Sequence, residues 1–308
     1  MDVLDDILNT LDLKGALYFR TDFSPPWAVE VPDLEQAARF HLLVQGKLHV
    51  GFPSGASVDL FPGDLVLIPR GLSHILSDQE GRDAPALETV IADAGYQGEG
   101  VFAVGKGNPK ASTQMICGHF TFREGADHPL LRALPEYMVI SAADRAREVW
   151  LDEVLRLLTR RMFADSEGSA ATITRLSEVF FIEMLRLGVG QSEEMQTVLA
   201  ALADRQIGKA LQLMHHRASQ PWTVETLAHE AGMSRSSFAE RFSELMGMGP
   251  MSYLSEWRLQ KALSMINDTR CSVQQAAAEA GYRSAAAFTR AFSARFGFAP
   301  RDLKRQNT

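Results

Sequence analysis

The sequence predicts an α+β protein of two domains: an N-terminal β-barrel with a helical hairpin, and a C-terminal all-α domain with tandem helix-turn-helix units. A chain of 308 residues has room for two domains. Short β-type segments separated by Gly and Pro fill its first half, and one helical pattern occurs twice in its last third. The predicted boundaries are residues 1–140 for the barrel, 141–190 for the hairpin and 191–308 for the C-terminal domain.

Composition narrows the class of protein. Hydrophobic residues make up 46% of the chain, which is enough for globular cores, and no apolar run is long enough to span a bilayer. The acidic N-terminus, MDVLDDILNT, argues against a secretory signal. Two cysteines, Cys117 and Cys271, are too few for a disulfide framework, so we expect a cytoplasmic protein.

Charge is divided unevenly along the chain. The formal net charge is −7, but residues 200–308 hold 14 Lys and Arg against 9 Asp and Glu, which gives +5 there and −12 in the rest. This asymmetry is expected when only the C-terminal part contacts phosphate groups. The surplus is moderate, so we expect modest DNA affinity from one chain and a contribution from dimerisation.

The first half is expected to contain these elements in order. Residues 1–13 have apolar side chains on one face and predict a short amphipathic helix. Strands are expected in the segments GALYFRTDF, PWAVEVP, ARFHLLVQGKLHVGF, SVDLFPGDLVLIPRGLSHILSD, ALETVIAD and TQMICGHFTF. Turns are expected at Gln45-Gly46 and Pro62-Gly63. Short strands at this spacing indicate a sandwich or a barrel.

Residues 142–163 and 171–187 predict two helices around a turn at Asp165–Gly168. Apolar residues recur there at helical spacing, at Val149, Leu151, Val154, Leu155, Leu158, Met162, Ile173, Leu176, Val179, Phe180, Met184 and Leu187. These faces either pack against the barrel or form a dimer interface. A hinge is expected at Gly188–Gln191, and residues 200–218 predict the first helix of the C-terminal domain.

The repeated pattern lies between Pro221 and Arg301. Its first copy has Val224, Ala228, Gly232, Ser234, Phe238, Phe242, Gly247 and Pro250, and its second has Val273, Ala277, Gly281, Ser284, Phe288, Phe292, Gly297 and Pro300. The residue types suit a helix-turn-helix: a small Ala for a close crossing, a Gly for positive φ, a Ser to cap the second helix, and two Phe to anchor it. A helical segment, Met251–Ile266, joins the copies.

This tandem pattern, with WRL at Trp257–Leu259 and GYRSAAAFTRAF at Gly281–Phe292, resembles the C-terminal DNA-binding domain of AraC/XylS-type transcription regulators. The resemblance implies two helix-turn-helix units bridged by a long helix, so that one chain contacts two successive major-groove segments of promoter DNA. It also implies a homodimer and an interaction with RNA polymerase.

The residues that face away from the anchoring phenylalanines are the candidate DNA contacts: Arg235, Ser236, Ser237, Glu240, Arg283, Ala285, Ala286, Thr289 and Arg290. Arg290 can pair with guanine, and Glu240 can accept a hydrogen bond from cytosine N4. Arg235 and Arg283 are better suited to phosphate, which positions the protein without specifying sequence. The alternative for any one of these residues is a solvated polar face.

The segment 63–74, GDLVLIPRGLSH, resembles the second cupin motif, and HLLVQG at 41–46 resembles the strand that closes the first. The stretch to about Ile140 resembles the cupin-type sensor domain of one branch of AraC-type regulators. That branch has further segments similar to Cys117–Phe120, Pro129–Leu131 and Leu134-Pro135.

The chain departs from enzymatic cupins at Arg39, which stands where they carry a metal-binding carboxylate, and it lacks their His-x-His. This departure weakens the alternative of a metal-dependent cupin enzyme fused to a DNA-binding module, so we expect no enzyme. A domain that only dimerises, without a ligand, is a third alternative.

His41, His74, Cys117 and His119 are the candidate metal or ligand pocket. Strand parity places His41 inward and puts Cys117 and His119 on one face. Imidazole and thiolate would suit a zinc-like divalent metal, although no cofactor is required by the sequence. Alternatively, Cys117 is an oxidant sensor whose pKa is lowered by His119 and Arg123. In the third interpretation these residues line a pocket for an organic effector.

Overall fold

The computed structural model of the chain describes residues 3, 6–7, 15–105, 111–123, 125, 128, 132–162, 169–188, 193–267 and 271–306. The chain forms two compact units. The barrel unit comprises Leu13–Arg123 and Leu134–Ser192, and the helical unit comprises Met1–Asp12, Glu124–Ala133 and Glu193–Thr308. Two short stretches that the predicted boundaries place with the barrel therefore belong to the helical unit.

Several predicted features fall outside the described residues. They are most of the helix over residues 1–13, the Asp165–Gly168 turn, the segment Pro129–Leu131 and most of the hinge Gly188–Gln191. Within the first of these, Val3, Asp6 and Ile7 are described as helical, and the side chains of Val3 and Ile7 are buried.

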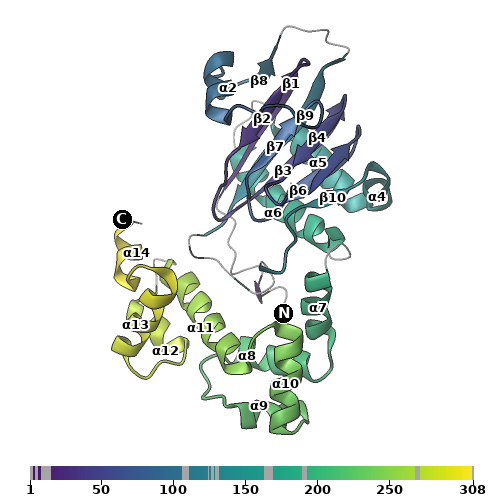
Figure 1. Cartoon of the computed structure of the whole chain (residues 1–308). Helices are drawn as coiled ribbons and strands as arrows, with labels where there is room; N and C mark the ends of the chain where they lie inside the picture. The colour runs from purple at the N-terminus through teal and green to yellow at the C-terminus, as the bar shows by residue number, and fades with distance from the viewer. Residues whose placement is uncertain are drawn as a thin grey trace. The chain divides into compact units, whose positions relative to one another are not determined.

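Two β-sheets build the barrel unit (Figure 1). One has six strands in the order β10 (Met138–Ile140), β6 (Leu65–Ile68), β3 (Ala37–Gln45), β9 (Thr113–Thr121), β1 (Gly15–Phe23) and β8 (Val101–Val104). The other has four in the order β2 (Ala28–Val31), β7 (His74–Ser77), β4 (Leu48–Gly51) and β5 (Ser57–Leu60). The predicted strands are confirmed except for one.

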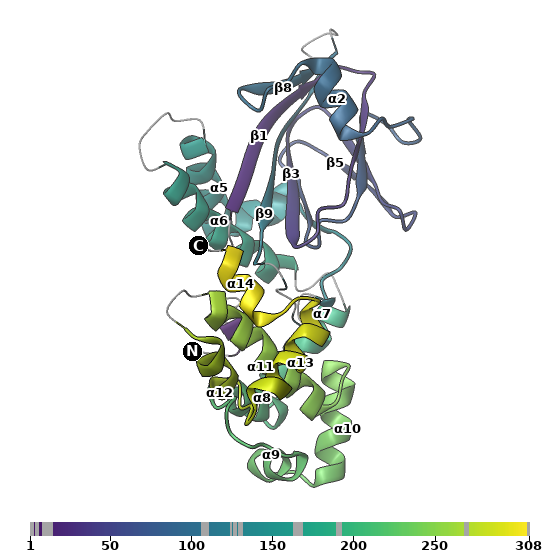
Figure 2. The ribbon, with the colours of Figure 1, turned by 90° about the vertical axis from the view of Figure 1, so that its left-hand side faces the viewer.

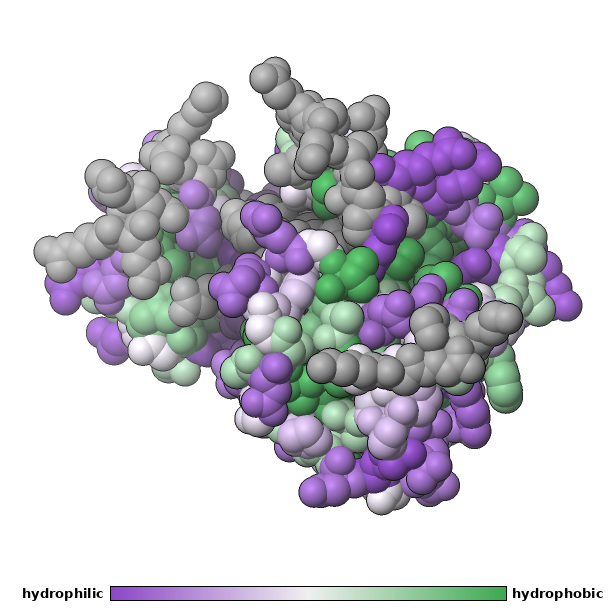
Figure 3. Space-filling view, turned by 90° about the horizontal axis from the view of Figure 1, so that it is seen from above, coloured by the Kyte–Doolittle hydropathy of each residue, from purple (hydrophilic) through white to green (hydrophobic). Residues whose placement is uncertain are grey.

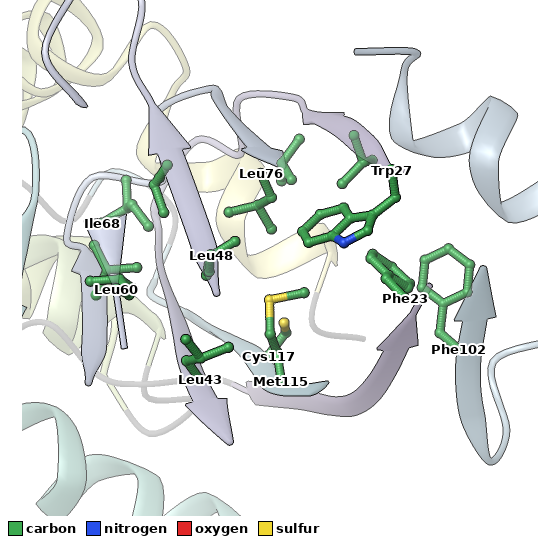
Figure 4. Packing of buried hydrophobic residues seen from close by; sticks show 14 of the residues in the cluster. Phe23, Trp27, Leu43, Leu48, Leu60, Ile68, Leu76, Phe102, Met115 and Cys117 are labelled. Atoms are coloured by element: carbon green, nitrogen blue, oxygen red, sulfur yellow. The ribbon is translucent and has the colours of Figure 1, made fainter. Parts of the chain in front are cut away.

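Apolar side chains of both sheets fill the interior. Figure 4 shows Met115 and Cys117 of β9 side by side among the buried side chains of this core. The ring of Phe23 packs edge-on against Trp27 and Phe102, with centroids 4.9 and 5.1 Å apart. Residues two apart on a strand point to the same face of the sheet. The inward-pointing residues of each strand therefore form both the core and the polar groups within it.

The turn between β3 and β4 requires glycine at position 46. Gly46 has a φ of 88°, and a Cβ there would lie 2.7 Å from the carbonyl oxygen of Ser112. No other residue combines that backbone conformation with so close an approach of a neighbouring chain. The predicted turn at this position is confirmed.

The segment ALETVIAD is a helix, and its prediction as a strand was wrong. α2 (Leu87–Ala94) ends at Gly95, which adopts the left-handed conformation with φ 63°. Leu87, Val90 and Ile91 lie at helical spacing and pack against the barrel core. A segment this short that contains β-branched residues fits the helical period of 3.6 residues as well as the strand period of two. Packing of its apolar side against the barrel core makes it a helix.

The predicted hairpin packs against the barrel. It consists of α4 (Ala142–Arg147), α5 (Val149–Met162) and α6 (Ser169–Gly188), and Figure 2 shows α5 and α6 alongside β1. The ring centroid of Phe180 lies 5.4 Å from that of Phe40 and 6.1 Å from that of Phe120. Phe40 alternates with the inward residues of β3, so α6 covers the outer face of the six-stranded sheet. Six of the predicted apolar positions are buried: Leu151, Val154, Leu155, Leu158, Phe180 and Met184.

Other apolar side chains of the hairpin remain exposed. Leu157 is 39% exposed and Val179 is 43% exposed, and Val149 and Trp150 at the start of α5 are more exposed still. Figure 3 shows green apolar residues reaching the surface in patches bordered by purple hydrophilic ones. The hairpin therefore has a buried face toward the sheet and a partly apolar outer face.

The helical unit contains α7 (Glu193–Ala203), α8 (Ile207–His216), α9 (Val224–Ala231), α10 (Arg235–Met246), α11 (Pro250–Asn267), α12 (Val273–Glu279), α13 (Ala285–Phe296) and α14 (Pro300–Gln306). The single helix predicted over residues 200–218 was wrong, because the chain breaks at Asp204. Its carboxylate accepts hydrogen bonds from the backbone N–H groups of Gln206 and Ile207, both at 2.9 Å, which starts a new helix. No helix in the described part of the chain is long and apolar enough to cross a membrane.

A buried polar cluster ties distant segments together within the helical unit. The hydroxyl of Tyr253 on α11 lies 3.1 Å from Nε2 of His128 and 2.7 Å from Nε2 of His215. The carboxylate of Asp6 lies 3.7 Å from Nδ1 of His215. Burial raises the pKa of Tyr253 and lowers the pKa of both histidines, which keeps the ring groups neutral. Residues from the N-terminus and from the loop after β9 are thus anchored on the helices.

Candidate nucleic-acid interface and barrel cavity

The first helix-turn-helix is formed by α9 and α10. Thr223 caps α9, and Gly232 ends it with a φ of 69°. The hydroxyl of Ser234 accepts a hydrogen bond from the backbone N–H of Ser237 and starts α10. Phe238 and Phe242 are fully buried beneath α10, as their spacing predicts.

The second helix-turn-helix repeats this arrangement with α12 and α13. Ser272 caps α12, Gly281 has a φ of 76°, and Ser284 caps α13. Phe288 and Phe292 are fully buried beneath α13. The second copy has one more residue between its glycine and its capping serine, so the two copies differ in length at the turn.

α11 joins the two units as one helix of 18 residues, as the segment Met251–Ile266 predicts. Tyr253, Leu254 and Trp257 are buried in the half of α11 next to the first helix-turn-helix. Leu263 and Ile266 belong to the core of the second helix-turn-helix. One rigid element therefore sets the separation of the two recognition helices.

The outer faces of α10 and α13 are solvent-accessible. Thr289 is half-exposed, and the other candidate contacts are exposed, namely Arg235, Ser236, Ser237, Glu240, Arg283, Ala285, Ala286 and Arg290. Glu240 lies two residues after Phe238, and Arg290 lies two residues after Phe288, so they occupy equivalent places. Neither forms a hydrogen bond or ion pair with any residue that the structure describes.

Three of the candidate contacts on α10 have partners within the protein. Arg235 forms an ion pair with Glu225. The hydroxyl of Ser237 accepts a hydrogen bond of 2.9 Å from Ser234, and that of Ser236 lies 3.3 Å from the same group. These side chains take part in local contacts at the start of α10, whereas Glu240 is free to meet a partner.

Inside the barrel, three of the four candidate pocket residues form a hydrogen-bonded chain. Nδ1 of His41 lies 3.0 Å from Sγ of Cys117, and Nε2 of His41 lies 2.9 Å from Nε2 of His74. Nδ1 of His74 donates to the carbonyl oxygen of Leu72 at 2.8 Å. That bond leaves His74 Nε2 as an acceptor, so His41 donates to it and in turn accepts from the Cys117 thiol.

Burial keeps every member of this chain neutral. It lowers the pKa of His74 to about 4, lowers the pKa of His41 well below its usual range, and raises the pKa of the Cys117 thiol. The predicted lowering of the Cys117 pKa by His119 and Arg123 was therefore wrong. A buried thiol with a raised pKa lacks the thiolate that an oxidant sensor needs.

The same geometry does not form a metal centre. His41 uses its two nitrogens for partners on opposite sides of its ring, so the nitrogen of His74 and the sulfur of Cys117 do not converge on one point. Four-coordinate zinc requires its ligand atoms around one position, about 2.0–2.3 Å from it. In the described part of the chain, no group of three or more His, Cys, Asp or Glu is placed to hold a metal ion.

The fourth candidate, His119, is outside this hydrogen-bonded chain, but it lines the same cavity of about 480 Å³ as His41 and Cys117, together with Arg39. Arg39 and His119 are direct partners in the β3–β9 register. Burial and the neighbouring Arg39 lower the pKa of His119. The rest of the wall is mostly apolar and includes Phe19, Phe102 and Tyr96.

Thr21 is a polar residue of this cavity that the sequence analysis did not single out. The signal was available, because Thr21 lies between Phe19 and Phe23 in the period-two pattern of β1. A threonine among aromatic residues on an inward face is buried.

Comparison with known proteins agrees with both halves of this description. A family model described as Cupin matches residues 2–189, and one described as Helix-turn-helix domain matches residues 227–306. The DNA-binding domain of AdpA, solved in complex with a target DNA, is 30% identical, covers 33% of this chain and 92% of that chain, and gives a TM-score of 0.31.

Relatives match along most of their length. The transcriptional regulator AlkR of Acinetobacter baylyi is 28% identical over 312 residues, covering 100% of both chains. RclR of Escherichia coli, an RCS-specific transcriptional activator, is 28% identical over 267 residues, covering 86% of this chain and 84% of its own. An AraC-like transcription regulator of Streptomyces lividans is 30% identical over 320 residues, covering 100% of this chain and 99% of its own.

These relatives are named as transcription regulators. Their similarity extends over the barrel as well as the tandem helix-turn-helix. The chain belongs to the AraC-type transcription regulators with an N-terminal cupin domain, and it binds double-stranded DNA.

Proposed function

We propose that α10 and α13 make the base contacts of this regulator and that a small organic molecule in the barrel cavity is its effector. The observation that carries the proposal is the equivalent placement of Glu240 and Arg290. Each is exposed on a recognition helix and makes no hydrogen bond or ion pair within the described residues. Charged side chains left free on two such helices suit two successive segments of a major groove.

The candidate contacts differ in what they supply. Arg290 can form two hydrogen bonds to guanine O6 and N7, and Glu240 can accept one from cytosine N4. Ala285 and Ala286 offer methyl contacts to thymine. Arg235 and Arg283 stand near the starts of the two recognition helices, where they can contact phosphate. We expect Arg235 to exchange its pair with Glu225 for a phosphate oxygen.

An organic effector is favoured over a metal or an oxidant. His41, His74 and Cys117 satisfy one another in a neutral chain of hydrogen bonds, which leaves neither a thiolate nor converging ligand atoms. The cavity that His41 and Cys117 help to line is mostly apolar and has the size of a small-molecule site. A regulator whose barrel only dimerises would have no use for a cavity of this kind.

We further propose a cytoplasmic homodimer that acts together with RNA polymerase. Leu157 and Val179 motivate the dimer, because they are exposed apolar residues on the outer side of the hairpin. The moderate positive charge of the C-terminal part supports it, since a second copy adds phosphate contacts.

Genome-wide mapping of bound sites tests the proposal. The wild-type chain should occupy promoters that share two short sequence blocks about one helical turn apart. The variant Arg290→Ala with Glu240→Ala should lose this preference while keeping weak binding to many sequences. Occupancy by the variant of the same promoters, with unchanged motif strength, would contradict the assignment of these helices.

A further inference from the structure

The barrel cavity has one charged end. Apolar side chains from β1, β2, β8, β9 and α2 form most of its wall, including Phe23, Val29, Phe102 and Ile91. Arg39 and His119 lie side by side at one end on neighbouring strands. A buried guanidinium beside a mostly apolar space is the feature that a ligand has to match.

Arg39 is held in place but forms no ion pair within the described part of the chain. Its side chain is 9% exposed, and its guanidinium donates a hydrogen bond to the carbonyl oxygen of Pro32. It forms no ion pair with any carboxylate that the structure describes. The carboxylates of Asp33 and Glu88 also line the cavity without forming an ion pair with Arg39; that of Asp33 accepts a hydrogen bond from the backbone N–H of Ser73, and Glu88 is exposed on α2.

Burial of this cation is costly unless it is paired. Desolvation lowers the pKa of Arg39, and Asp33 and Glu88 offset this only in part. A guanidinium presents a planar set of donors that matches a carboxylate, and the bond is strongest where water is excluded. An anionic group on a ligand in the cavity would supply an ion-pair partner for the guanidinium of Arg39.

A second polar group marks the far part of the cavity. Thr21 is 3% exposed, and its hydroxyl has no hydrogen-bond partner among the described residues. Thr21 pairs with Met115 in the β1–β9 register, whereas Arg39 pairs with His119. These rows are four positions apart on β9, at Met115 and His119, which is roughly 13 Å along the strand. Between them lies the row of His41 and Cys117, whose polar atoms are hydrogen-bonded to each other, with the apolar ring of Phe19 beside them on β1.

We infer that the cavity binds an apolar carboxylic acid, with its carboxylate on Arg39 and its hydrocarbon or aromatic body along the wall toward Thr21. This inference rests on the proposed effector role of the barrel and specifies its ligand. A neutral hydrocarbon would leave the guanidinium buried and unpaired, and an amine would bring a second positive charge to it. A hydroxyl or carbonyl oxygen on the ligand body would give Thr21 a partner.

Calorimetric titration of the full-length protein tests the inference with three probes of one length: octanoic acid, methyl octanoate and octylamine. Octanoate should bind about tenfold or more tightly than the ester, because hydrogen bonds to a charged group are lost in the ester. Octylamine should not bind. Arg39→Gln should lower the affinity for octanoate by a similar factor and leave the affinity for the ester unchanged. Arg39→Lys should restore part of the difference in affinity between octanoate and the ester.

Arg70→Gln is the matched control, since Arg70 is exposed at the end of β6, and it should bind all three probes like the wild type. Equal or tighter binding of the ester or the amine to the wild type would overturn the acid and leave a cavity for another effector. Binding of none of the probes, with DNA binding intact, would overturn the acid and count against the effector role as well. Because the probe comparison uses the wild type, it decides the matter even if Arg39→Gln does not fold.

Discussion

Nε2 of His41 lies 2.9 Å from Nε2 of His74, the histidine that ends the segment resembling the second cupin motif. The imidazole of His41 therefore lies where a metal ion bound to Nε2 of His74 would have to lie. His74 is thus part of a neutral hydrogen-bonded chain in the core. Arg39, which stands where enzymatic cupins carry a carboxylate, lines the cavity next to this chain.

We expect this histidine pair to make the barrel sensitive to acid. The folded-state pKa of His74 is about 4, whereas an unfolded histidine has a pKa near 6.5. Stability that is present above about pH 6.5 is lost as the pH falls toward about 4, because the unfolded chain binds the proton first. The loss approaches about 1.4 kcal/mol per pH unit for each such histidine.

His74→Gln should reduce the dependence of stability on pH between 6.5 and 4. Thermal unfolding at a series of pH values measures this dependence. His216→Gln is the control, because the His216 side chain is 48% exposed. A slope between pH 6.5 and 4 that is the same in His74→Gln as in the wild type would show that His74 does not contribute.

Gly232→Ala should destabilise the helical unit by about 1–2 kcal/mol, because an L-residue is strained at its φ of 69°. No atom lies within 4 Å of the added Cβ, so the effect comes from the backbone alone. Urea unfolding measures the free energy of unfolding. Gly249→Ala is the control: Gly249 has no positive φ and equal space, so the change should be neutral or slightly stabilising. Equal effects at the two positions would refute the argument.

Tyr253→Phe should cost about 1–3 kcal/mol of folding free energy, because it removes the shared partner of His128 and His215 in a buried site. Tyr282→Phe should have little effect, since the Tyr282 hydroxyl makes no hydrogen bond within the described residues. Chemical unfolding of both variants measures the difference. If the two substitutions cost the same, the Tyr253 cluster does not anchor the segments that meet there.

Leu157→Glu combined with Val179→Glu should convert the proposed dimer to a folded monomer, because both side chains are exposed and apolar. Light scattering after size-exclusion chromatography gives the mass. Val44→Glu, on an exposed apolar residue of β3, should leave the dimer intact. A wild-type protein that is monomeric at micromolar concentration would contradict the proposal.

Leu155 is not a suitable position for such a test. It is 6% exposed, so a charge there would be buried and would destabilise the hairpin. Helical spacing identified both apolar faces of the hairpin but could not tell which one meets the sheet. Which face is buried depends on the shape of the surface that it packs against, and the spacing of apolar residues carries no information about that surface.

Local patterns predicted most of the fold and part of the site. The period of two placed His41 and Cys117 inward, and the repeated Gly, Ser and Phe positions placed both helix-turn-helix units. Pairing of residues far apart in the chain could not be predicted. His128 is 125 residues from Tyr253, and no pattern around either one indicates that they meet. The break at Asp204 was missed because a capping aspartate resembles any other polar residue on a helix.

Hydroxyl-radical footprinting of the wild-type protein on a bound promoter tests the central claim most directly. One chain that places α10 and α13 in successive major-groove segments should protect two regions whose centres lie about one helical turn, roughly 34 Å, apart. Arg290→Ala should weaken binding by about 1–3 kcal/mol and relax the preference at one base pair in the region bound by α13. A single protected region per chain, or equal weakening on every sequence, would contradict this account.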